Sequence, residues 1–364
     1  MKLVVTQENL AKAVQVVGRV ASGKTPLPIL NNILFRTEKN RLLLAATNLE
    51  IAITQHIGSK IEEEGSLTVP AKLMSEFMSS LPKGNVTLEA DGTKLHIKNG
   101  AYQSTINGML PDEFPALPEI TANQEVTLNP ATLKRAIQQT VLVASADDTR
   151  PVLTGVYCHT YEGVLHFAAT DGYRLAERSL GPVEQEISAI IPAQTLQDVL
   201  RVMSDDLAEI KLIFDENQVR ILLDDIEITS RLIDGAFPDY RQLIPAKSDI
   251  EATLAKDEFT RITKVASLFA RESGGSVTLK VSEADLKLAI HSVASQLGEN
   301  NSEADAKVNA AGQVTLNSRY LIEALGCIDS PTVTFTFSGK LSACILQAAE
   351  KERDYKHIIM PLKS

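Results

Sequence analysis

The chain has 364 residues, of which 44% are hydrophobic and 23% charged; this suits two or three compact domains and argues against a disordered polypeptide. No secretion signal opens it, no apolar run approaches the roughly 18 residues of a membrane helix, and its three scattered cysteines form no CxxC pair. We therefore expect a cytoplasmic protein without disulfides; the net charge of −10 argues against nucleic acid only until the positions of the charges are considered.

Six segments show helical periodicity. In the first of them Leu10, Ala13, Val14 and Val17 recur at the spacing of one helix face. In the second and fourth a proline stands at the start, where a helix does not need the missing N–H. We predict helices over residues 6–21, 70–80, 130–145, 192–203, 255–270 and 317–328.

Between these helices lie β-rich runs, at residues 41–53, 85–97, 164–169, 209–223, 276–290 and 331–346. Four short polar segments read as hairpin turns: Lys83-Gly84-Asn85, Asp91-Gly92, Asp215-Glu216-Asn217 and Ser338-Gly339-Lys340. Because the strands come in consecutive runs, the predicted class is α+β with antiparallel sheets rather than βαβ crossovers.

The chain also repeats itself. An offset of 123 residues separates Leu10 from Leu133, Thr47 from Thr170 and Phe114 from Phe237, and an offset of 122 separates Pro70 from Pro192. A third, more diverged unit follows, with Phe259 standing 126 residues after Leu133. The prediction is three similar domains, at residues 1–122, 123–248 and 249–364, each with two helices and about eight strands.

Residues 18–25 match the nucleotide-binding pattern GxxxxGK[ST] letter for letter. A phosphate loop needs a buried strand before it and a helix after it. Here helical periodicity precedes the motif and Pro26-Leu27-Pro28 follows it, so a helix cannot readily continue. We interpret the segment as the loop that ends the first helix, with nucleotide binding as the alternative.

Other catalytic patterns are not found. The six histidines have no metal-ligand spacing, no GxSxG elbow occurs, and no cysteine is visibly paired with a base. The sequence therefore predicts a protein that is not an enzyme, with no catalytic residues, no metal and no cofactor.

Charge is unevenly distributed between the predicted helices and the rest of the chain. The helices hold ten basic residues: Lys12, Arg19, Lys72, Lys134, Arg135, Arg201, Lys256, Arg261, Lys264 and Arg319. They hold six acids, so their net charge is +4 and the remaining segments carry −14. Solvated faces of amphipathic helices would explain this, as would helices that face a polyanion. Few aromatic residues and no tryptophan accompany the basic ones, which favours phosphate contacts on duplex DNA over base stacking.

Four stretches in this order and spacing are specific to one family: Leu27-Pro28-Ile29-Leu30-Asn31-Asn32, Ala169-Thr170-Asp171-Gly172-Tyr173-Arg174-Leu175-Ala176, Asp234-Gly235-Ala236-Phe237-Pro238-Asp239-Tyr240-Arg241 and Ile358-Ile359-Met360-Pro361-Leu362. With them, the full chain resembles the bacterial DNA polymerase III beta subunits, the sliding clamps. The resemblance implies three DNA-clamp domains, each with two helices packed on antiparallel sheets, and a ring-shaped head-to-tail homodimer.

The resemblance also implies which residues face duplex DNA. With the helix charges it gives Lys12, Arg19, Lys24, Lys72, Lys134, Arg135, Arg150, Arg201, Arg261 and Lys264; Lys24 and Arg150 match loop positions that touch DNA in relatives. Pro151-Val152 replace an aromatic pair found in some relatives. For the dimer interface, Leu268 and Phe269 match an apolar pair of the third domain, with a partner surface expected from Tyr102 to Ile106.

Family members bind a short linear motif in a pocket between the second and third domains. Carried over by motif, its wall comprises Leu153, Thr170, Gly172, Tyr173, Arg174, Leu175, Pro238, Leu243, Ile358, Met360, Pro361 and Leu362. Without the resemblance, the apolar C-terminal residues would be interpreted as an ordinary last strand. Three positions depart from the family pattern: Tyr173 stands where a His is common, Gln242 stands where some relatives have an Arg, and the last residues are Lys363-Ser364 rather than an Arg-bearing tail. These differences bear on which partner motif the pocket prefers.

The partners that this resemblance implies are double-stranded DNA bound without sequence preference, DNA polymerase III and other polymerases, the clamp loader, mismatch-repair and ligase-type clamp-binding proteins, and a second copy of the chain, with no membrane. A repeat-built protein-interaction scaffold without topological DNA binding is the alternative.

Overall fold

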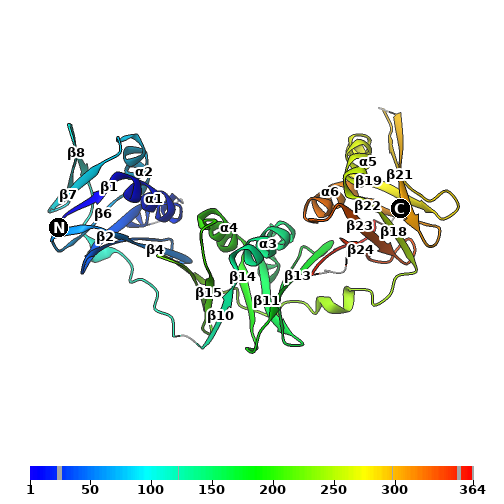
Figure 1. Cartoon of the computed structure of the whole chain (residues 1–364), viewed down its shortest axis with the longest axis horizontal. Helices are drawn as coiled ribbons and strands as arrows, with labels where there is room; N and C mark the ends of the chain where they lie inside the picture. The colour runs from blue at the N-terminus through cyan, green and yellow to red at the C-terminus, as the bar shows by residue number, and fades with distance from the viewer. Residues whose placement is uncertain (23–26, 122, 297, 351–353, 363–364) are drawn as a thin grey trace. The chain divides into compact units, whose positions relative to one another are not determined.

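The computed structural model describes residues 1–22, 27–121, 123–296, 298–350 and 354–362 (Figure 1). It divides into two compact units. The first unit comprises Met1–Thr132 and Gln194–Leu232, and the second comprises Leu133–Ala193 and Ile233–Ser364. The central sequence repeat therefore contributes to both units. Within the described residues, no helix combines the length and the apolar character needed to cross a bilayer.

The first unit contains two antiparallel sheets. One has the strand order β5 (Lys60–Glu63), β1 (Lys2–Thr6), β7 (Asn85–Asp91), β8 (Lys94–Asn99) and β9 (Tyr102–Asn107). The other has the order β10 (Gln124–Leu128), β15 (Ile210–Phe214), β16 (Gln218–Leu223), β17 (Ile226–Arg231), β4 (Ile51–Gly58), β3 (Arg41–Thr47), β2 (Asn32–Glu38) and β6 (Ser66–Pro70). The pairing of β17 with β4 joins strands of the first two sequence repeats.

The second unit contains a twelve-stranded sheet. Its order is β14 (Ser188–Pro192), β11 (Gly155–Tyr161), β12 (Val164–Thr170), β13 (Arg174–Pro182), β25 (Tyr355–Ile359), β24 (Cys344–Ala348), β23 (Thr332–Phe337), β18 (Ile250–Ala255), β21 (Gly298–Val308), β20 (Lys287–Ala294), β19 (Ser276–Ser282) and β22 (Gly312–Asn317). Here β13 of the second repeat pairs with β25 of the third, as β4 pairs with β17 in the first unit.

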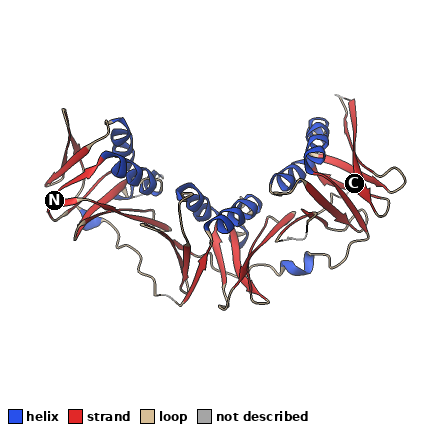
Figure 2. Cartoon of the chain, in the orientation of Figure 1, coloured by secondary structure: helices blue, strands red, loops and turns tan. Residues whose placement is uncertain are grey.

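The described residues form six α-helices, as predicted: α1 (Gln7–Val17), α2 (Ala71–Ser80), α3 (Pro130–Thr140), α4 (Ala193–Val202), α5 (Lys256–Phe269) and α6 (Ser318–Gly326). Helix α1 packs against α2, β3 and β4, and α5 packs against α6, β20 and β21 (Figure 2). The apolar spacing explains this packing, since Leu10, Ala13, Val14 and Val17 are all fully buried. The expected α+β class is confirmed.

The helices are shorter than predicted, mainly at their C-terminal ends. The prediction extended the first helix to residue 21 and the third to residue 145, whereas α1 ends at Val17 and α3 at Thr140. Short 3₁₀ turns follow both, at Val20–Ser22 and Val141–Val143. Apolar residues continue through these turns, so the periodicity alone could not show where the tighter 3₁₀ winding begins.

Three of the four predicted hairpin turns are confirmed. Asp91-Gly92 joins β7 to β8, residues 215–217 join β15 to β16, and residues 338–340 lie between the paired strands β23 and β24. The prediction for residues 83–85 was wrong, because this segment links α2 to β7. Strands β1–β9, β10–β17 and β18–β25 fall in the three predicted thirds, whose boundaries at 122 and 248 stay a prediction.

Candidate peptide groove and charged helices

The nucleotide-binding pattern at residues 18–25 lies in the wrong structural context. Helix α1 precedes it, and the Gly18 N–H donates to the Val14 carbonyl at 2.9 Å, which ends the helix. Lys24 and Thr25 lie outside the described residues, and β2 is the next regular element after a 3₁₀ turn at Pro28–Asn31. Within the described residues a helix rather than a strand leads into the motif, and a 3₁₀ turn and then a strand follow it, which agrees with a helix-terminating loop and not with a phosphate loop.

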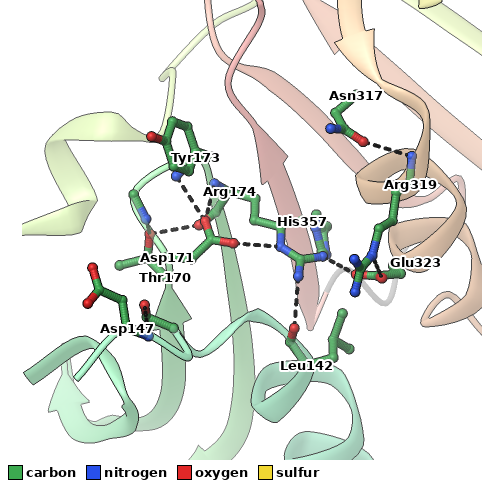
Figure 3. Close-up of polar contacts among 12 residues, drawn as sticks. Leu142, Asp147, Thr170, Asp171, Tyr173, Arg174, Asn317, Arg319, Glu323 and His357 are labelled. Carbon is green, nitrogen blue, oxygen red and sulfur yellow. Dashed lines mark hydrogen bonds and ion pairs between the residues drawn. The ribbon is translucent and has the colours of Figure 1, made fainter. Parts of the chain in front are cut away.

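The turn between β12 and β13 is fixed by side-chain hydrogen bonds (Figure 3). The Thr170 hydroxyl donates to the Arg174 carbonyl at 2.7 Å and accepts from the Gly172 N–H at 3.1 Å. Asp171 Oδ1 accepts from the N–H groups of Tyr173 and Arg174 at 2.9 and 3.0 Å. These bonds hold Tyr173 outward on a rigid turn, because threonine and aspartate side chains replace the missing backbone partners.

Arg174 connects this turn to two other elements of the second unit. Its Nε donates to Asp171 Oδ2 at 3.0 Å, one Nη donates to Glu323 of α6, and the other donates to the Leu142 carbonyl at 2.9 Å (Figure 3). Its guanidinium also lies 4.4 Å from the ring centroid of Tyr320. A buried cation with several hydrogen-bond partners fixes the start of β13 relative to α6.

This charge shapes its neighbours. Burial alone would raise the pKa of Glu323, but hydrogen bonds from Arg319 and Arg174 outweigh it and lower that pKa below its usual value. His357 on β25 is fully buried, and burial together with the Arg174 charge lowers its pKa to about 3. The site therefore holds a neutral histidine beside a fixed cation, with the Tyr355 hydroxyl 2.7 Å from His357 Nδ1.

An apolar floor spans the junction of β13 and β25. Leu175 is the Cα partner of Ile358, and both belong to a buried cluster with Tyr240. Phe237 and Ile244 pack against this cluster from the connecting segment that follows the second repeat. The floor therefore joins the second repeat, the third repeat and the segment between them.

The connecting segment is held on the sheet by polar contacts. The buried Tyr240 hydroxyl donates its proton to Glu177 at 2.5 Å. The Tyr240 oxygen can therefore only accept from His159 Nε2, which lies 2.8 Å away and acts as the donor. Arg241 pairs with Glu177 at 3.1 Å and stacks on Tyr161 with 3.6 Å to the ring centroid. Burial, and to a lesser extent the charge of Glu177, raises the pKa of Tyr240. The hydroxyl therefore stays protonated and can donate.

Some of the expected pocket residues are neighbours in the structure: the turn residues Thr170, Gly172, Tyr173 and Arg174, the paired Leu175 and Ile358, and Met360. Gly172, Tyr173, Pro238 and Leu243 are exposed; Met360, Pro361 and Leu362 are half-buried; Leu153, Thr170, Arg174, Leu175 and Ile358 are buried. The Met360 N–H donates to the Tyr173 carbonyl at 2.9 Å, which sets the tail against the turn. Arg150 also reaches this turn, since its guanidinium donates to the Asp171 carbonyl at 3.4 Å.

Not every expected residue joins the turn, and some supporting residues were missed. The Leu362 N–H donates to the Thr315 carbonyl on β22, so the tail leaves the turn after Met360. Sequence reasoning missed Glu323 and Tyr320, which contact Arg174 from α6. No spacing signal connects residues about 150 positions apart.

The basic residues expected to face DNA differ in their surroundings. Six of them are exposed on helices: Lys12, Lys72, Arg135, Arg201, Arg261 and Lys264. Lys134 is half-buried on α3, whereas Arg19 follows α1 and Arg150 lies in a loop. Lys24 lies outside the described residues. Arg135 pairs with Asp329 at 2.9 Å, and Arg201 pairs with Asp198 at 2.9 Å. Local acids therefore neutralise part of the helix charge.

The residues expected at a dimer interface are only partly available. Leu268 is exposed and Phe269 half-buried at the end of α5, and Tyr102 is 57% exposed on the edge strand β9. Ile106 is only 5% exposed in the single chain, and its place in a dimer interface stays a prediction. Because strand side chains alternate, Thr105 and Asn107 face outward instead.

Three repeats built on antiparallel sheets, each with two helices, define an α+β clamp protein. Three family models match the chain in order: the N-terminal, central and C-terminal domains of the DNA polymerase III beta subunit, at residues 1–118, 127–239 and 241–363. The beta sliding clamp of Staphylococcus aureus is 30% identical over 359 residues, 95% of each chain. The beta sliding clamp of Staphylococcus epidermidis is 30% identical over 360 residues, again 95% of each.

Solved structures agree. A sliding clamp from Pseudomonas aeruginosa bound to griselimycin matches with a TM-score of 0.95 and 25% identity, covering all of both chains. The sliding clamp from Bacillus subtilis matches with a TM-score of 0.95 and 26% identity, covering 100% of this chain and 99% of that one. The chain belongs to the DNA polymerase III beta subunit family, the bacterial sliding clamps. It is a DNA sliding clamp, as its sequence motifs predicted.

Proposed function

We propose that the chain acts without catalysis, as a head-to-tail homodimeric ring that encircles duplex DNA in the cytoplasm. Polymerases and other replication proteins are held there through a groove formed by β13, β25 and the connecting segment. The observation that carries the groove is the apolar floor of Leu175 and Ile358, bordered by exposed Tyr173, Pro238 and Leu243. Apolar side chains that stay exposed on a rigid frame favour a peptide ligand.

The partners we propose follow from family membership. They are DNA polymerase III, other polymerases, the clamp loader and the clamp-binding proteins of mismatch repair and ligation. Each would place a short segment with apolar anchors in the groove, since a few anchor residues supply most of the energy of such interfaces. Tyr173 and the half-buried Met360 flank the entrance and so bear on which motif is preferred.

Topological retention is the decisive property of a ring. The protein is loaded onto circular duplex DNA by a compatible clamp loader, and the circle is then cut once with a restriction enzyme. A ring stays on circles and runs off linear DNA, because nothing but closure holds it. Equal loss from both forms, or equal retention on both, would mean ordinary contact and would favour a protein-interaction scaffold instead.

The groove has its own test. We expect Met360→Ala combined with Leu362→Ala to lower polymerase affinity at least tenfold, since truncating apolar anchors costs about 1–3 kcal/mol each. The matched control is Leu286→Ala with Val293→Ala, two exposed apolar residues elsewhere in the third repeat. Affinity is measured by surface plasmon resonance and dimerisation by sedimentation. Unchanged polymerase affinity in the Met360 and Leu362 variant would refute this groove assignment.

A further inference from the structure

The junction of the first two repeats contains a turn built like the one in the proposed groove. The Thr47 hydroxyl donates to the Ile51 carbonyl at 3.0 Å and accepts from the Leu49 N–H at 3.0 Å. Asn48 Oδ1 accepts from the N–H groups of Glu50 and Ile51 at 3.0 and 2.9 Å. This turn joins β3 to β4, entirely within the first unit.

Each of these bonds has a counterpart 123 residues further along, in the turn from Thr170 to Arg174. The correspondence extends to the neighbouring strand. The Arg231 N–H donates to the Glu50 carbonyl at 3.0 Å, just as the Met360 N–H donates to the Tyr173 carbonyl at 2.9 Å. The backbone frame of the proposed peptide groove is therefore present twice in the chain.

The first-junction frame also encloses a hollow. A cavity of about 270 Å³ lies there, lined by residues that include Leu49, Ala52, Pro115, Pro118, Thr229 and Arg231. Arg220 fixes one wall, because its Nη2 donates to the Pro118 carbonyl at 2.9 Å. On the floor of the cavity, Ala52 pairs with Thr229. At the second junction, the corresponding pair is Leu175 and Ile358. The volume suits one or two side chains rather than a large ligand.

Leu49 lies at the mouth in an unusual conformation. Its φ is +77°, in the left-handed region that disfavours a branched residue, and its side chain is 47% exposed. The corresponding residue at the second junction is Gly172, with φ +92°, which adopts this region without a side-chain clash. Leu49 therefore presents an exposed apolar side chain at the edge of the cavity, where a ligand can contact it.

The mouth differs from the second junction in charge. Glu50 and Arg231 occupy the places of Tyr173 and Met360, and their closest charged atoms are 3.8 Å apart. Both side chains are well exposed, 72% for Glu50 and 66% for Arg231, so this loose pair can be exchanged at little cost. A carboxylate from a ligand can meet the Arg231 guanidinium in a shorter two-point contact.

We propose that the first junction is a second peptide site, for a short extended segment with an aliphatic side chain followed by Asp or Glu. The aliphatic group enters the cavity beside Leu49, and the carboxylate displaces Glu50 from Arg231. The proposal rests on the proposed function, because it takes the second junction as the peptide groove whose frame is repeated. A small floor and a charged mouth make the two sites select different segments.

The test uses the full-length protein with labelled methyl groups and the blocked peptide acetyl-Ala-Leu-Asp-Ala-amide, followed by NMR. The methyl signals of Leu49 and Ala52 are expected to shift in a saturable way. Arg231→Ala should weaken binding about tenfold, because it removes a charge-assisted contact. Glu50→Gln should tighten binding, because it removes the competing carboxylate. Both residues are exposed, so neither change threatens the fold.

Two peptides serve as controls. The Asn analogue, acetyl-Ala-Leu-Asn-Ala-amide, should bind about tenfold more weakly, and acetyl-Ala-Ala-Asp-Ala-amide should lose the apolar contact. Shifts confined to Leu175 and Ile358 would overturn the second site while leaving the proposed function intact. Equal response to the Asp and Asn peptides, or no shift at Leu49 and Ala52, would also overturn it. Failure of the proposed function itself appears elsewhere, as unchanged polymerase affinity in the Met360 and Leu362 variant.

Discussion

Arg174 and Arg319 bind the same carboxylate from different environments. Arg174 is 8% exposed and contacts Glu323, Asp171 and a backbone carbonyl, whereas Arg319 is 79% exposed and contacts Glu323 across one helical turn. An exposed pair of this kind contributes about 0–1 kcal/mol, but removing one member of a buried network leaves charges without partners. The two arginines therefore differ in their expected contribution to stability, although their chemistry is the same.

We expect Arg174→Met to lower the free energy of unfolding by about 3 kcal/mol and Arg319→Met by less than about 1 kcal/mol. Asp171 and Glu323 lose their shared cation in the first variant, whereas Arg174 still holds Glu323 in the second. Urea unfolding followed by circular dichroism gives both values. Equal effects of the two substitutions would show that the buried network contributes no more than the surface pair.

The neutral state of His159 predicts a pH dependence. Burial, then the charges of His166 and Arg241, lower its pKa to about 4 from an ordinary value of 6.5. Below pH 6.5 the unfolded chain gains a proton that the folded chain refuses, so stability present above that pH is lost as pH falls toward 4. The loss approaches about 1.4 kcal/mol per pH unit across this window.

The variant His159→Gln isolates this contribution, because its amide can still donate to the Tyr240 oxygen but does not titrate between pH 7 and 4. We expect a smaller fall in stability between pH 7 and pH 4.5 in this variant than in the unmodified protein. Urea midpoints at the two pH values measure it. Parallel falls in both proteins would assign the acid sensitivity to other groups.

At the scale of elements, the 3₁₀ turn Tyr240–Leu243 links the connecting segment to the groove. Its first residue anchors it through Glu177 and His159, and its last residue, the exposed Leu243, belongs to the wall of the proposed groove. Tyr240 should therefore act as a positioning residue. Its hydroxyl never needs to touch the bound peptide.

We expect Tyr240→Phe to weaken peptide binding in the groove about threefold to tenfold while the dimer persists. The variant loses a hydrogen bond that contributes about 1 kcal/mol to holding the turn in place. Leu243→Ala is the comparison, because it removes the wall without freeing the turn. Peptide association and dissociation rates from surface plasmon resonance distinguish the two: a loosened turn slows association, whereas a missing wall mainly speeds dissociation. A Tyr240→Phe profile identical to that of Leu243→Ala would count against a positioning role.

The elements themselves were largely predictable, and the reason is periodicity. Fully buried Leu10, Ala13, Val14 and Val17 show that helical spacing reported the buried face correctly. The repeat itself was found in part through the offset between Thr47 and Thr170, and the structure shows that each begins a similar turn, in which the next residue, Asn48 or Asp171, accepts backbone hydrogen bonds. Features that depend on local sequence patterns, such as the buried face of a helix, could therefore be predicted from the sequence.

Two kinds of information were missing. Contacts between distant segments have no local signal, so the pairing of Arg174 with Glu323, 149 residues away, could not be foreseen. Strand faces were the other difficulty, because a shift of one residue exchanges inside for outside. On β9 the expected interface residue Ile106 is buried, whereas its neighbours Thr105 and Asn107 are exposed.

For the whole molecule, the central question is how a chain of net charge −10 can bind DNA. Within their observed bounds, the six helices still carry nine basic and six acidic residues. Two of those acids, Asp198 and Glu323, are held in ion pairs with arginines. A ring that is closed around its ligand needs only weak contacts, so a modest excess on the helices is sufficient and tight binding would hinder sliding.

This predicts that the position of a charge matters more than its number. Arg261→Glu with Lys264→Glu reverses two exposed charges on α5, and Lys280→Glu with Lys307→Glu reverses two exposed charges on strands of the same repeat. Both pairs change the net charge equally. We expect only the α5 pair to weaken duplex binding and to reduce the slope of log affinity against log salt by about 2, since each lost phosphate contact contributes about 0.9. Fluorescence anisotropy over a salt series measures this, and equal slopes for the two pairs would mean that net charge, rather than the helix surface, governs DNA binding.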